Sequence, residues 1–204
     1  MSLIANIALV VIPSYLVGAI PASFIAGKMV RGIDLREHGS GNLGAANTFR
    51  VLGRRAAVPV LLFDIGKGFV AVWYLSALGG EGILFSLLAA VAVVLGHNYS
   101  VFVRFSGGKG VGTTAGAFLA LAPYAVLFCV LIWVITLLVT RIVSLASMVA
   151  ALLLPAAVYL SNRFLGAGTH GSVLILSIIV AALVIYKHRP NIQRLREGSE
   201  KRIF

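Results

Sequence analysis

Three polar segments of the chain gather residue types that bind phosphate. They are GSGNLGAANTFR at 39–50, GHNYSVFVRFSGGKGVGT at 96–113 and HRPNIQRLREGSEKR at 188–202. Glycine lets successive backbone N–H groups converge on an anion, and Ser, Asn, Lys, Arg and His add hydrogen bonds and positive charge. Most of the remaining chain is strongly apolar. The sequence therefore predicts chemistry on an anionic substrate at one face of a membrane.

The first segment offers an anion both backbone amides and side-chain donors. Its glycines allow unusual turns, Ser40 can donate a neutral hydrogen bond, and Arg50 can bind a phosphate through two N–H groups at once. An ordinary Gly/Asn turn between two spans is the alternative interpretation. The density of ligand types in this short stretch favours a site. The candidate residues are Gly39, Ser40, Gly41, Asn42, Asn47 and Arg50.

The second segment carries the glycine-rich stretch GGKG, which leads into an expected helix start at Thr113 and Thr114. A glycine-rich loop that feeds a helix N-terminus binds anions through backbone N–H groups. It is not a nucleotide P-loop, which needs a glycine where Val103 stands and Ser or Thr directly after Lys109. We therefore expect phosphate without a nucleotide, with a flexible loop as the alternative. The candidates are Gly107, Gly108, Lys109 and Gly110.

The second segment also contains His97, close to its start. A histidine in this place can donate a proton, bind phosphate or cap the end of the preceding helix. The sequence leaves these three tasks open. We count His97 among the candidate substrate contacts.

The third segment follows the last apolar run. His188 and Asn191 are three residues apart and can share one helical face. The basic residues around them can also simply contact anionic lipid headgroups. Glu197 is an acid among bases, and for it we expect a structural ion pair rather than catalysis.

Polar side chains within or beside the apolar runs form a further group of candidates. Asp64 and Lys67 are three residues apart in one expected span, so they can form an ion pair that braces the site. Ser144 and Ser147 follow Arg141 near an expected inner helix end. Ser147 is a candidate substrate contact, with helix packing through small residues as the alternative.

Composition sets the class of protein. The chain has 204 residues, 60% hydrophobic and 11% charged, and a soluble fold of this length could not bury so much apolar surface. The formal net charge is +11, which in a soluble protein would suggest a nucleic-acid partner. Here membrane topology accounts for much of the excess, because Lys and Arg collect on the cytoplasmic side. We expect one all-α integral-membrane domain over 1–204 and no nucleic-acid partner.

The apolar runs predict about seven transmembrane helices. A bilayer is crossed by roughly 20 apolar residues in a helix. Pro13 and Pro21 are candidate kinks in the first run. A version with five spans treats 111–140 differently and keeps the polar segments on the same side. The runs are about 3–25, 56–78, 82–96, two short helices within 111–140 that meet near Pro123, 143–160 and 172–186.

The distribution of positive charge predicts the orientation. With the N-terminus outside, the inner segments hold 15 of the 17 Lys and Arg residues. So strong an asymmetry places all three polar segments, and the C-terminus, on the cytoplasmic side.

Several familiar catalytic signatures are missing from the sequence. No His is followed five residues later by Asp, no G-x-S-x-G elbow occurs, and no His/Cys cluster has the spacing of metal ligands. The acidic residues form no obvious pair for acid/base work, and the single cysteine, Cys129, has no partner. We therefore expect neither a metal nor a cofactor.

Taken together, the three segments resemble the signatures of the bacterial acyl-phosphate:glycerol-3-phosphate acyltransferases (PlsY). That family has three cytoplasmic signatures, and GSGNLGAANTFR, GHNYSVFVRFSGGKGVGT and HRPNIQRLREGSE occur here in the same order, separated by apolar runs that also look alike. Ala46 stands where the resemblance leads us to expect Thr, and Pro190 precedes Asn191. Neither departure removes a candidate ligand.

The resemblance implies a reaction and its participants. An acyl group would move from acyl phosphate to the sn-1 hydroxyl of glycerol 3-phosphate, giving lysophosphatidic acid and phosphate, with neither acyl-CoA nor acyl carrier protein as donor. It implies an enzyme of the bacterial cytoplasmic membrane, surrounded by lipids and functionally linked to a soluble enzyme that produces acyl phosphate. The resemblance implicates Ser40, Arg50, Lys109, His188 and Asn191 in catalysis and Ser147 in substrate binding.

Two other classes of protein would also use spans and anion ligands. A carrier for a phosphorylated metabolite needs its site near the bilayer midplane, where only Asp64 and Lys67 are expected. A basic scaffold that recruits anionic lipid would tolerate scrambled glycine loops. One observation would distinguish an enzyme from a carrier and from a scaffold. Only an enzyme would release phosphate from palmitoyl phosphate in a manner that depends on glycerol 3-phosphate.

Overall fold

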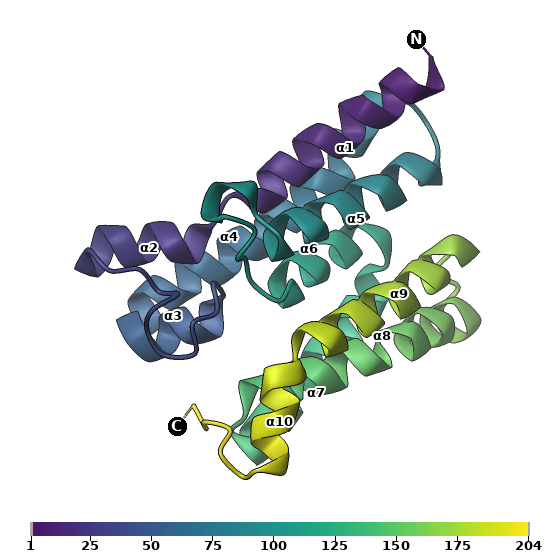
Figure 1. Ribbon diagram of the computed structural model, residues 1–204. Coiled ribbons are helices and arrows are strands. Elements are labelled where there is room, and N and C mark those ends of the chain that lie inside the picture. Colours follow the sequence, from purple (N-terminus) through teal and green to yellow (C-terminus); the bar gives the residue numbers. More distant parts are fainter. Residues whose placement is uncertain (1, 204) are drawn as a thin grey trace. The chain divides into compact units, whose positions relative to one another are not determined.

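The computed structural model describes residues 2–203, and every regular element within that range is a helix. The chain divides into two compact units, residues 1–120 and residues 121–204. In Figure 1, unit 1 is coloured from purple to teal and unit 2 from green to yellow. The all-α architecture confirms the predicted fold class. The expectation of a single domain stays a prediction.

Unit 1 begins with a long apolar helix that breaks where the sequence predicted a kink. Its first run contains Pro13 inside a continuous helix, whereas Pro21 separates that helix from the next. Short 3-10 helices follow two of the later α-helices. The described elements of unit 1 are α1 Leu3–Ala19, α2 Ala22–Arg31, α3 Ala45–Leu52, α4 Arg54–Trp73, η1 Leu75–Gly79, α5 Ile83–Asn98, η2 Val101–Val103 and α6 Val111–Leu121.

Helices α1 and α5 lie side by side because glycines let their backbones approach closely (Figure 1). A Cβ atom at Gly18 would run into the backbone of Val93, and one at Gly96 would meet the carbonyl of Tyr15. Small residues at such crossings are typical of membrane helices, which associate through close packing. The Tyr15 hydroxyl also donates a hydrogen bond of 2.7 Å to the carbonyl of Tyr99. These contacts fix the end of α5, where the second polar segment begins.

The break between α1 and α2 exposes backbone carbonyls that other elements then bind. A helix leaves its last carbonyls without intrahelical donors, and inside a membrane protein they need other partners. The Ser100 hydroxyl donates to the carbonyl of Ala19, and Lys67 Nζ donates to the carbonyl of Ile20 at 3.2 Å. The α1–α2 break, α4 and the segment after α5 therefore meet at one place.

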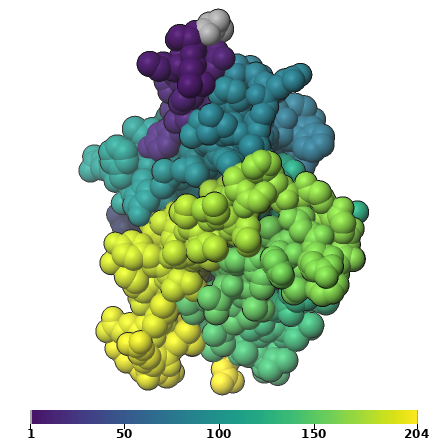
Figure 2. Space-filling model, turned by 90° about the vertical axis from the view of Figure 1, so that its right-hand side faces the viewer, coloured from purple at the N-terminus to yellow at the C-terminus, as the bar shows by residue number. Residues whose placement is uncertain are grey.

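Unit 2 is a helical hairpin extended by a third long helix and a short basic one. Helix α8 packs against both α7 and α9. Pro123 begins α7, which confirms the predicted break near that residue. In Figure 2 the yellow C-terminal segment lies alongside the green helices of unit 2. The described helices of unit 2 are α7 Pro123–Thr140, α8 Val143–Leu165, α9 Gly171–Lys187 and α10 Arg189–Arg196.

The helices confirm a multi-pass membrane protein, but with fewer long spans than the seven predicted. Five helical stretches among the described residues are long and apolar enough to cross a bilayer, or six if the bent pair α9 and α10 is one span. The discrepancy arises mainly at 111–140. There α6 has only 11 residues, about 16 Å at the usual rise per residue, against a hydrocarbon core of roughly 30 Å.

Candidate functional site

The first polar segment forms a loop whose shape depends on the side chain of Asn47. Gly39 and Gly41 have positive φ angles, 67° and 70°, which favour glycine. Asn47 is buried in α3, and its Oδ1 accepts the N–H of Ser40 at 2.7 Å. Its Nδ2 donates to the carbonyls of Leu35 and His38 at 3.1 and 3.0 Å. Both amide hydrogens of Asn47 are thus used inside the loop, so it shapes the loop and leaves Ser40 exposed.

Replacing Asn47 by Asp is expected to disorder this loop. The change preserves shape but puts a carboxylate oxygen where the Nδ2 donor faces two carbonyl oxygens. Leaving such buried acceptors unpaired costs about 1–3 kcal/mol. Trypsin should then cut after Arg36 faster than in the wild type. Asn42→Asp, the same change in the same loop at a half-buried side chain, is the control, and equal cutting of both variants would contradict the assignment.

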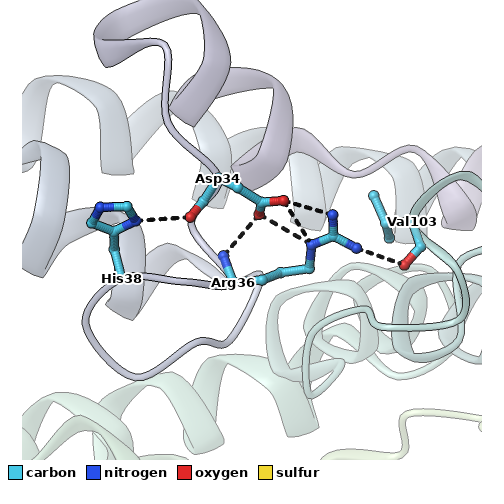
Figure 3. A network of polar contacts seen from close by, with 4 residues as sticks. All are labelled: Asp34, Arg36, His38 and Val103. Carbon is cyan, nitrogen blue, oxygen red and sulfur yellow. Dashed lines mark hydrogen bonds and ion pairs between the residues drawn. The ribbon is translucent and has the colours of Figure 1, made fainter.

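An ion pair at the start of the loop connects it to the second polar segment (Figure 3). The Arg36 guanidinium binds the Asp34 carboxylate through Nε at 3.0 Å and Nη2 at 2.6 Å. Its Nη1 donates to the carbonyl of Val103 at 3.1 Å. His38 Nδ1 donates to the backbone carbonyl of Asp34 at 2.9 Å. The hydrogen bond from Arg36 is the main reason that the pKa of Asp34 falls to about 2.

The depressed pKa of Asp34 makes this contact sensitive to acid. Because the folded pKa lies below the unfolded value of about 3.9, the contact stabilises the protein above that value and is lost as pH falls toward 2. We expect Asp34→Asn to melt at a lower temperature than the wild type at pH 7. This difference should shrink between about pH 4 and pH 2. A difference that stays constant over this range would contradict the ion-pair assignment.

The glycine turn of the second segment is packed directly on the end of α5. The N–H of Gly108 donates to the carbonyl of His97 at 3.0 Å. A Cβ atom at Gly107 would collide with that same carbonyl, and one at Gly110 would lie 2.8 Å from Oδ1 of Asn98. Gly110 also has a φ angle of +81°. A side chain would not fit at any of the three glycine positions. Their close packing on α5 fixes the backbone of Lys109, which is half-buried and lies between two of them.

Helix α6 begins directly after the glycine turn, as the sequence predicted. The first N–H groups of a helix have no acceptor within it and carry a partial positive charge. Thr113 and Thr114 lie in this first turn, and their buried hydroxyl oxygens have no hydrogen-bond partner among the described residues. The turn and the helix start together have the chemistry of an anion site.

The first two polar segments lie side by side in unit 1. Leu35, Leu43 and Val103 form one buried hydrophobic cluster that joins the two loops. A Cβ atom at Gly108 would lie 2.7 Å from the carbonyl oxygen of Leu43. Arg50, in the last turn of α3, is half-buried. Two segments that lie far apart in the sequence thus form one polar centre.

The predicted pair of Asp64 and Lys67 is present on α4. Lys67 Nζ lies 2.7 Å from Asp64 Oδ1, and both side chains are almost wholly buried. Nδ1 of His97 lies 2.9 Å from the same Lys67 Nζ. The pair therefore lies at the end of α5, next to His97, whose backbone carbonyl accepts the N–H of Gly108 in the glycine turn.

In unit 2, His188 and Asn191 lie at the bend between α9 and α10, and both are buried. His188 Nδ1 donates to the carbonyl of Val184 at 2.8 Å, which places its proton on Nδ1 when the ring is neutral. The Asn191 amide nitrogen donates to Glu200 Oε1 at 2.6 Å. Backbone and carboxylate contacts thus orient both predicted catalytic side chains.

Glu200 is a buried residue with contacts to two predicted site segments that the sequence interpretation missed. Its Oε1 accepts hydrogen bonds from Ser144 and Asn191, both at 2.6 Å, and its Oε2 accepts one from Arg194 at 2.6 Å. Burial alone would raise the pKa of Glu200, but these three donors outweigh it and lower the pKa. A single buried carboxylate thus connects α8 and α10.

Among the described residues Glu197 makes no ion pair, and the ion pair of this tail is made by Glu200. Glu197 is exposed and accepts hydrogen bonds from Gln193 and Ser199. Arg194 pairs with Glu200 instead. The two acids are three residues apart in the same basic tail, and only their burial distinguishes them. The sequence signal available was weak: Glu200 is the second acid of that tail.

Ser147, a predicted substrate contact, lies buried near the start of α8. The indole Nε1 of Trp133 on α7 donates to its hydroxyl oxygen at 3.2 Å. The backbone N–H of Ile203 donates to the carbonyl of Arg141, so the C-terminal tail closes over the α7–α8 turn. The contact with Trp133 leaves the Ser147 hydroxyl hydrogen able to donate elsewhere.

The fold and these polar centres define an integral-membrane helical protein whose polar segments lie at its helix ends. Residues 8–198 match the model of the glycerol-3-phosphate acyltransferase family, and the chain belongs to this family. Glycerol-3-phosphate acyltransferase of Chlorobaculum parvum is 40% identical over 216 residues, 93% of each chain. Glycerol-3-phosphate acyltransferase 2 of Moorella thermoacetica is 42% identical over 195 residues, 96% of each chain.

Two solved structures of PlsY, an integral membrane glycerol 3-phosphate acyltransferase, are similar to this chain. The glycerol 3-phosphate form has a TM-score of 0.84 at 38% identity, covering 96% of this chain and 94% of that one. The lysophosphatidic acid form has a TM-score of 0.81 at 36% identity, covering 99% and 95%. The comparisons confirm the resemblance seen in the three polar segments and the acyltransferase class.

Proposed function

We propose that the chain transfers an acyl group from acyl phosphate to the sn-1 hydroxyl of glycerol 3-phosphate. The hydroxyl oxygen attacks the acyl carbon, the new ester bond forms, and the bond from that carbon to the phosphate oxygen breaks. The hydroxyl proton leaves with the phosphate, so the products are lysophosphatidic acid and inorganic phosphate. Because acyl phosphate is an activated anhydride with a good leaving group, positioning and charge stabilisation supply most of the catalysis.

One observation carries this proposal: the glycine turn at 107–110 is packed on α5 and leads directly into the start of α6. Fixed N–H groups, buried threonine hydroxyls and the positive end of the helix suit a phosphoryl group. We assign the phosphoryl group of the acyl donor to this turn. Lys109, within the turn, then neutralises charge that develops as the phosphate leaves.

The acceptor is assigned to the other predicted residues. Arg50 provides two N–H groups for the phosphate of glycerol 3-phosphate. In its neutral form, His188 has Nε2 as its acceptor nitrogen, which suits a hydroxyl group. Asn191, held by Glu200, adds a neutral polar contact, and the exposed Ser40 orients reacting groups.

The surroundings of the reaction follow from the charge distribution. Because 15 of the 17 Lys and Arg residues fall on one predicted side, we place the reaction on the cytoplasmic face of the bacterial cytoplasmic membrane. The apolar acyl tail then stays in the lipid while both phosphates stay in water. A soluble enzyme that produces acyl phosphate is the expected partner in function.

The donor is identified by one assay on the purified full chain in detergent. Palmitoyl phosphate, palmitoyl-CoA and palmitoyl-acyl carrier protein are offered in turn with glycerol 3-phosphate. We expect turnover with palmitoyl phosphate alone, with one phosphate released for each lysophosphatidic acid formed. Turnover with palmitoyl-CoA and none with palmitoyl phosphate would reject the proposed donor. Uptake of glycerol 3-phosphate into vesicles without any acyl product would instead favour a carrier.

A further inference from the structure

Three ionisable side chains meet in the interior of unit 1, away from the exposed loops. Asp64 and Lys67 of α4 are 4% and 5% exposed, and His97 of α5 is 8% exposed. Apolar replacements of a buried ion pair are often as stable as the pair itself. Ionisable groups inside a membrane segment therefore point first to function rather than to stability.

The Lys67 ammonium group has three hydrogens and three acceptors around it. Nζ lies 2.7 Å from Asp64 Oδ1, 3.2 Å from the carbonyl oxygen of Ile20 and 2.9 Å from His97 Nδ1. His97 Nδ1 also lies 3.4 Å from Asp64 Oδ1, but the ammonium group, which can only donate, is the nearer partner at 2.9 Å and makes Nδ1 the accepting nitrogen. The proton of the neutral ring is then on Nε2. The three contacts fix both the tautomer and the orientation of the imidazole.

The opposite edge of the imidazole faces the glycine turn. A Cβ atom at Gly108 would run into His97 Nε2 and lie 2.9 Å from its Cε1 atom. The N–H of Gly108 donates to the backbone carbonyl of the same histidine. His97 therefore contacts the turn with both its ring and its backbone. A shift of the ring would move the turn.

The space between the ring and the turn is too small for a substrate. A cavity of about 10 Å³ lies there, lined by Asp64, His97, Ser100, Gly107, Gly108 and the α1–α2 break. This is about the room that one water molecule needs, and a phosphoryl group does not fit. The buried face of His97 thus serves the protein rather than the ligand.

We infer that Asp64, Lys67 and His97 are positioning residues, which hold the turn at 107–110 in the shape that binds the phosphoryl group of the acyl donor. This assignment rests on the proposed function of the turn. It gives His97 a different task from the substrate contact expected from the sequence. The buried ion pair, acting through the imidazole, then supports the binding of the acyl donor and not that of glycerol 3-phosphate.

The inference predicts a selective kinetic defect. Loss of the support beneath the turn should weaken the donor site and leave the acceptor site intact. Misplacement of a binding group by an ångström costs up to about 100-fold. We therefore expect the KM for palmitoyl phosphate to rise about tenfold or more, while the KM for glycerol 3-phosphate changes less than about twofold.

The test uses the full chain with two variants chosen to fold. Asp64→Leu combined with Lys67→Met removes both charges together, so that neither remains buried and unpaired. His97→Asn keeps an acceptor near Lys67 but removes the ring edge that meets Gly108. Ser76→Ala, which removes a buried hydroxyl bonded to Val72 in the same apolar stretch, is the control. Thermal melting in detergent establishes which variants are folded before kinetics are measured.

The kinetic outcomes are distinct. A folded variant with an unchanged KM for palmitoyl phosphate would overturn the inference. An equal rise in the KM of both substrates would also overturn it, because that is the result of general loosening. A rise for palmitoyl phosphate alone, absent from Ser76→Ala, supports it.

A spectroscopic measurement tests the geometry without any substrate. The ¹⁵N chemical shifts of imidazole nitrogens distinguish a protonated nitrogen from an accepting one. His97 of the wild type, assigned through the backbone resonances of the uniformly labelled protein, should carry its proton on Nε2, and a folded double variant should lose this preference. A proton on Nδ1 in the wild type would overturn the inference even if neither variant folds. A wild type with the expected tautomer but no turnover of palmitoyl phosphate would reject the proposed donor instead.

Discussion

Replacing Lys109 by alanine is expected to lower turnover about 100-fold or more while leaving the protein folded. Removal of one group that stabilises developing charge costs about 10²–10³ in kcat. Lys109 is half-buried within a turn that glycines and α5 hold in place, so its side chain starts from a fixed backbone position. The loss should appear mainly in kcat, since the charge on the leaving phosphate grows as the acyl bond breaks.

The matched control removes a positive charge from the same segment. Arg104→Gln lies five residues earlier at an exposed position, and it should keep nearly full turnover because a solvated charge contributes little at a distance in salt. Phosphate release measured at saturating palmitoyl phosphate and glycerol 3-phosphate compares the two variants. Similar rates for both would show that the segment acts only through its overall charge. The phosphoryl site would then have to be placed elsewhere.

The fold was predictable wherever the signal was local. The length of the apolar runs identified the membrane helices, and Pro21 and Pro123 marked two breaks that the structure contains. The ion pair of Asp64 and Lys67 was also local, since residues three apart share a helical face. The number of spans could not be predicted in this way, because an apolar run gives no sign that α6 ends after 11 residues.

The supporting contacts of the site were not predictable, because they join distant parts of the chain. Asn47 resembled a ligand by residue type, but its amide is bonded to the loop that precedes it. His97 lies 30 residues from Lys67 in sequence, and the local sequence around each residue does not indicate that the two are in contact. Composition thus identified which residues gather at the site. It could not separate those that contact the substrate from those that hold the others in place.

Glu200→Gln is the second substitution from which we expect a large effect. Ser144, Asn191 and Arg194 all donate to this one carboxylate. A glutamine amide offers a single oxygen, and its NH₂ group would face at least one of these donors. Hydrogen bonds to a charged group contribute about 1.5–3 kcal/mol each, so the variant should melt well below the wild type. Turnover should fall about 10- to 100-fold, because Asn191 loses the partner that orients it.

Acid should remove the difference in stability between Glu200→Gln and the wild type. The folded pKa of Glu200 is lowered, so its contribution is complete above the ordinary value of about 4.3 and is lost as pH falls through the folded value. Melting curves of the two proteins should therefore begin to converge once the pH falls below that ordinary value.

Glu197→Gln makes the same chemical change at an exposed side chain three residues earlier. It should match the wild type in melting temperature and turnover at every pH. If instead Glu197→Gln caused the loss and Glu200→Gln did not, the buried carboxylate would have no part in orienting Asn191. Because both substitutions remove one negative charge from the same basic tail, a difference between them can arise only from the contacts that each acid makes.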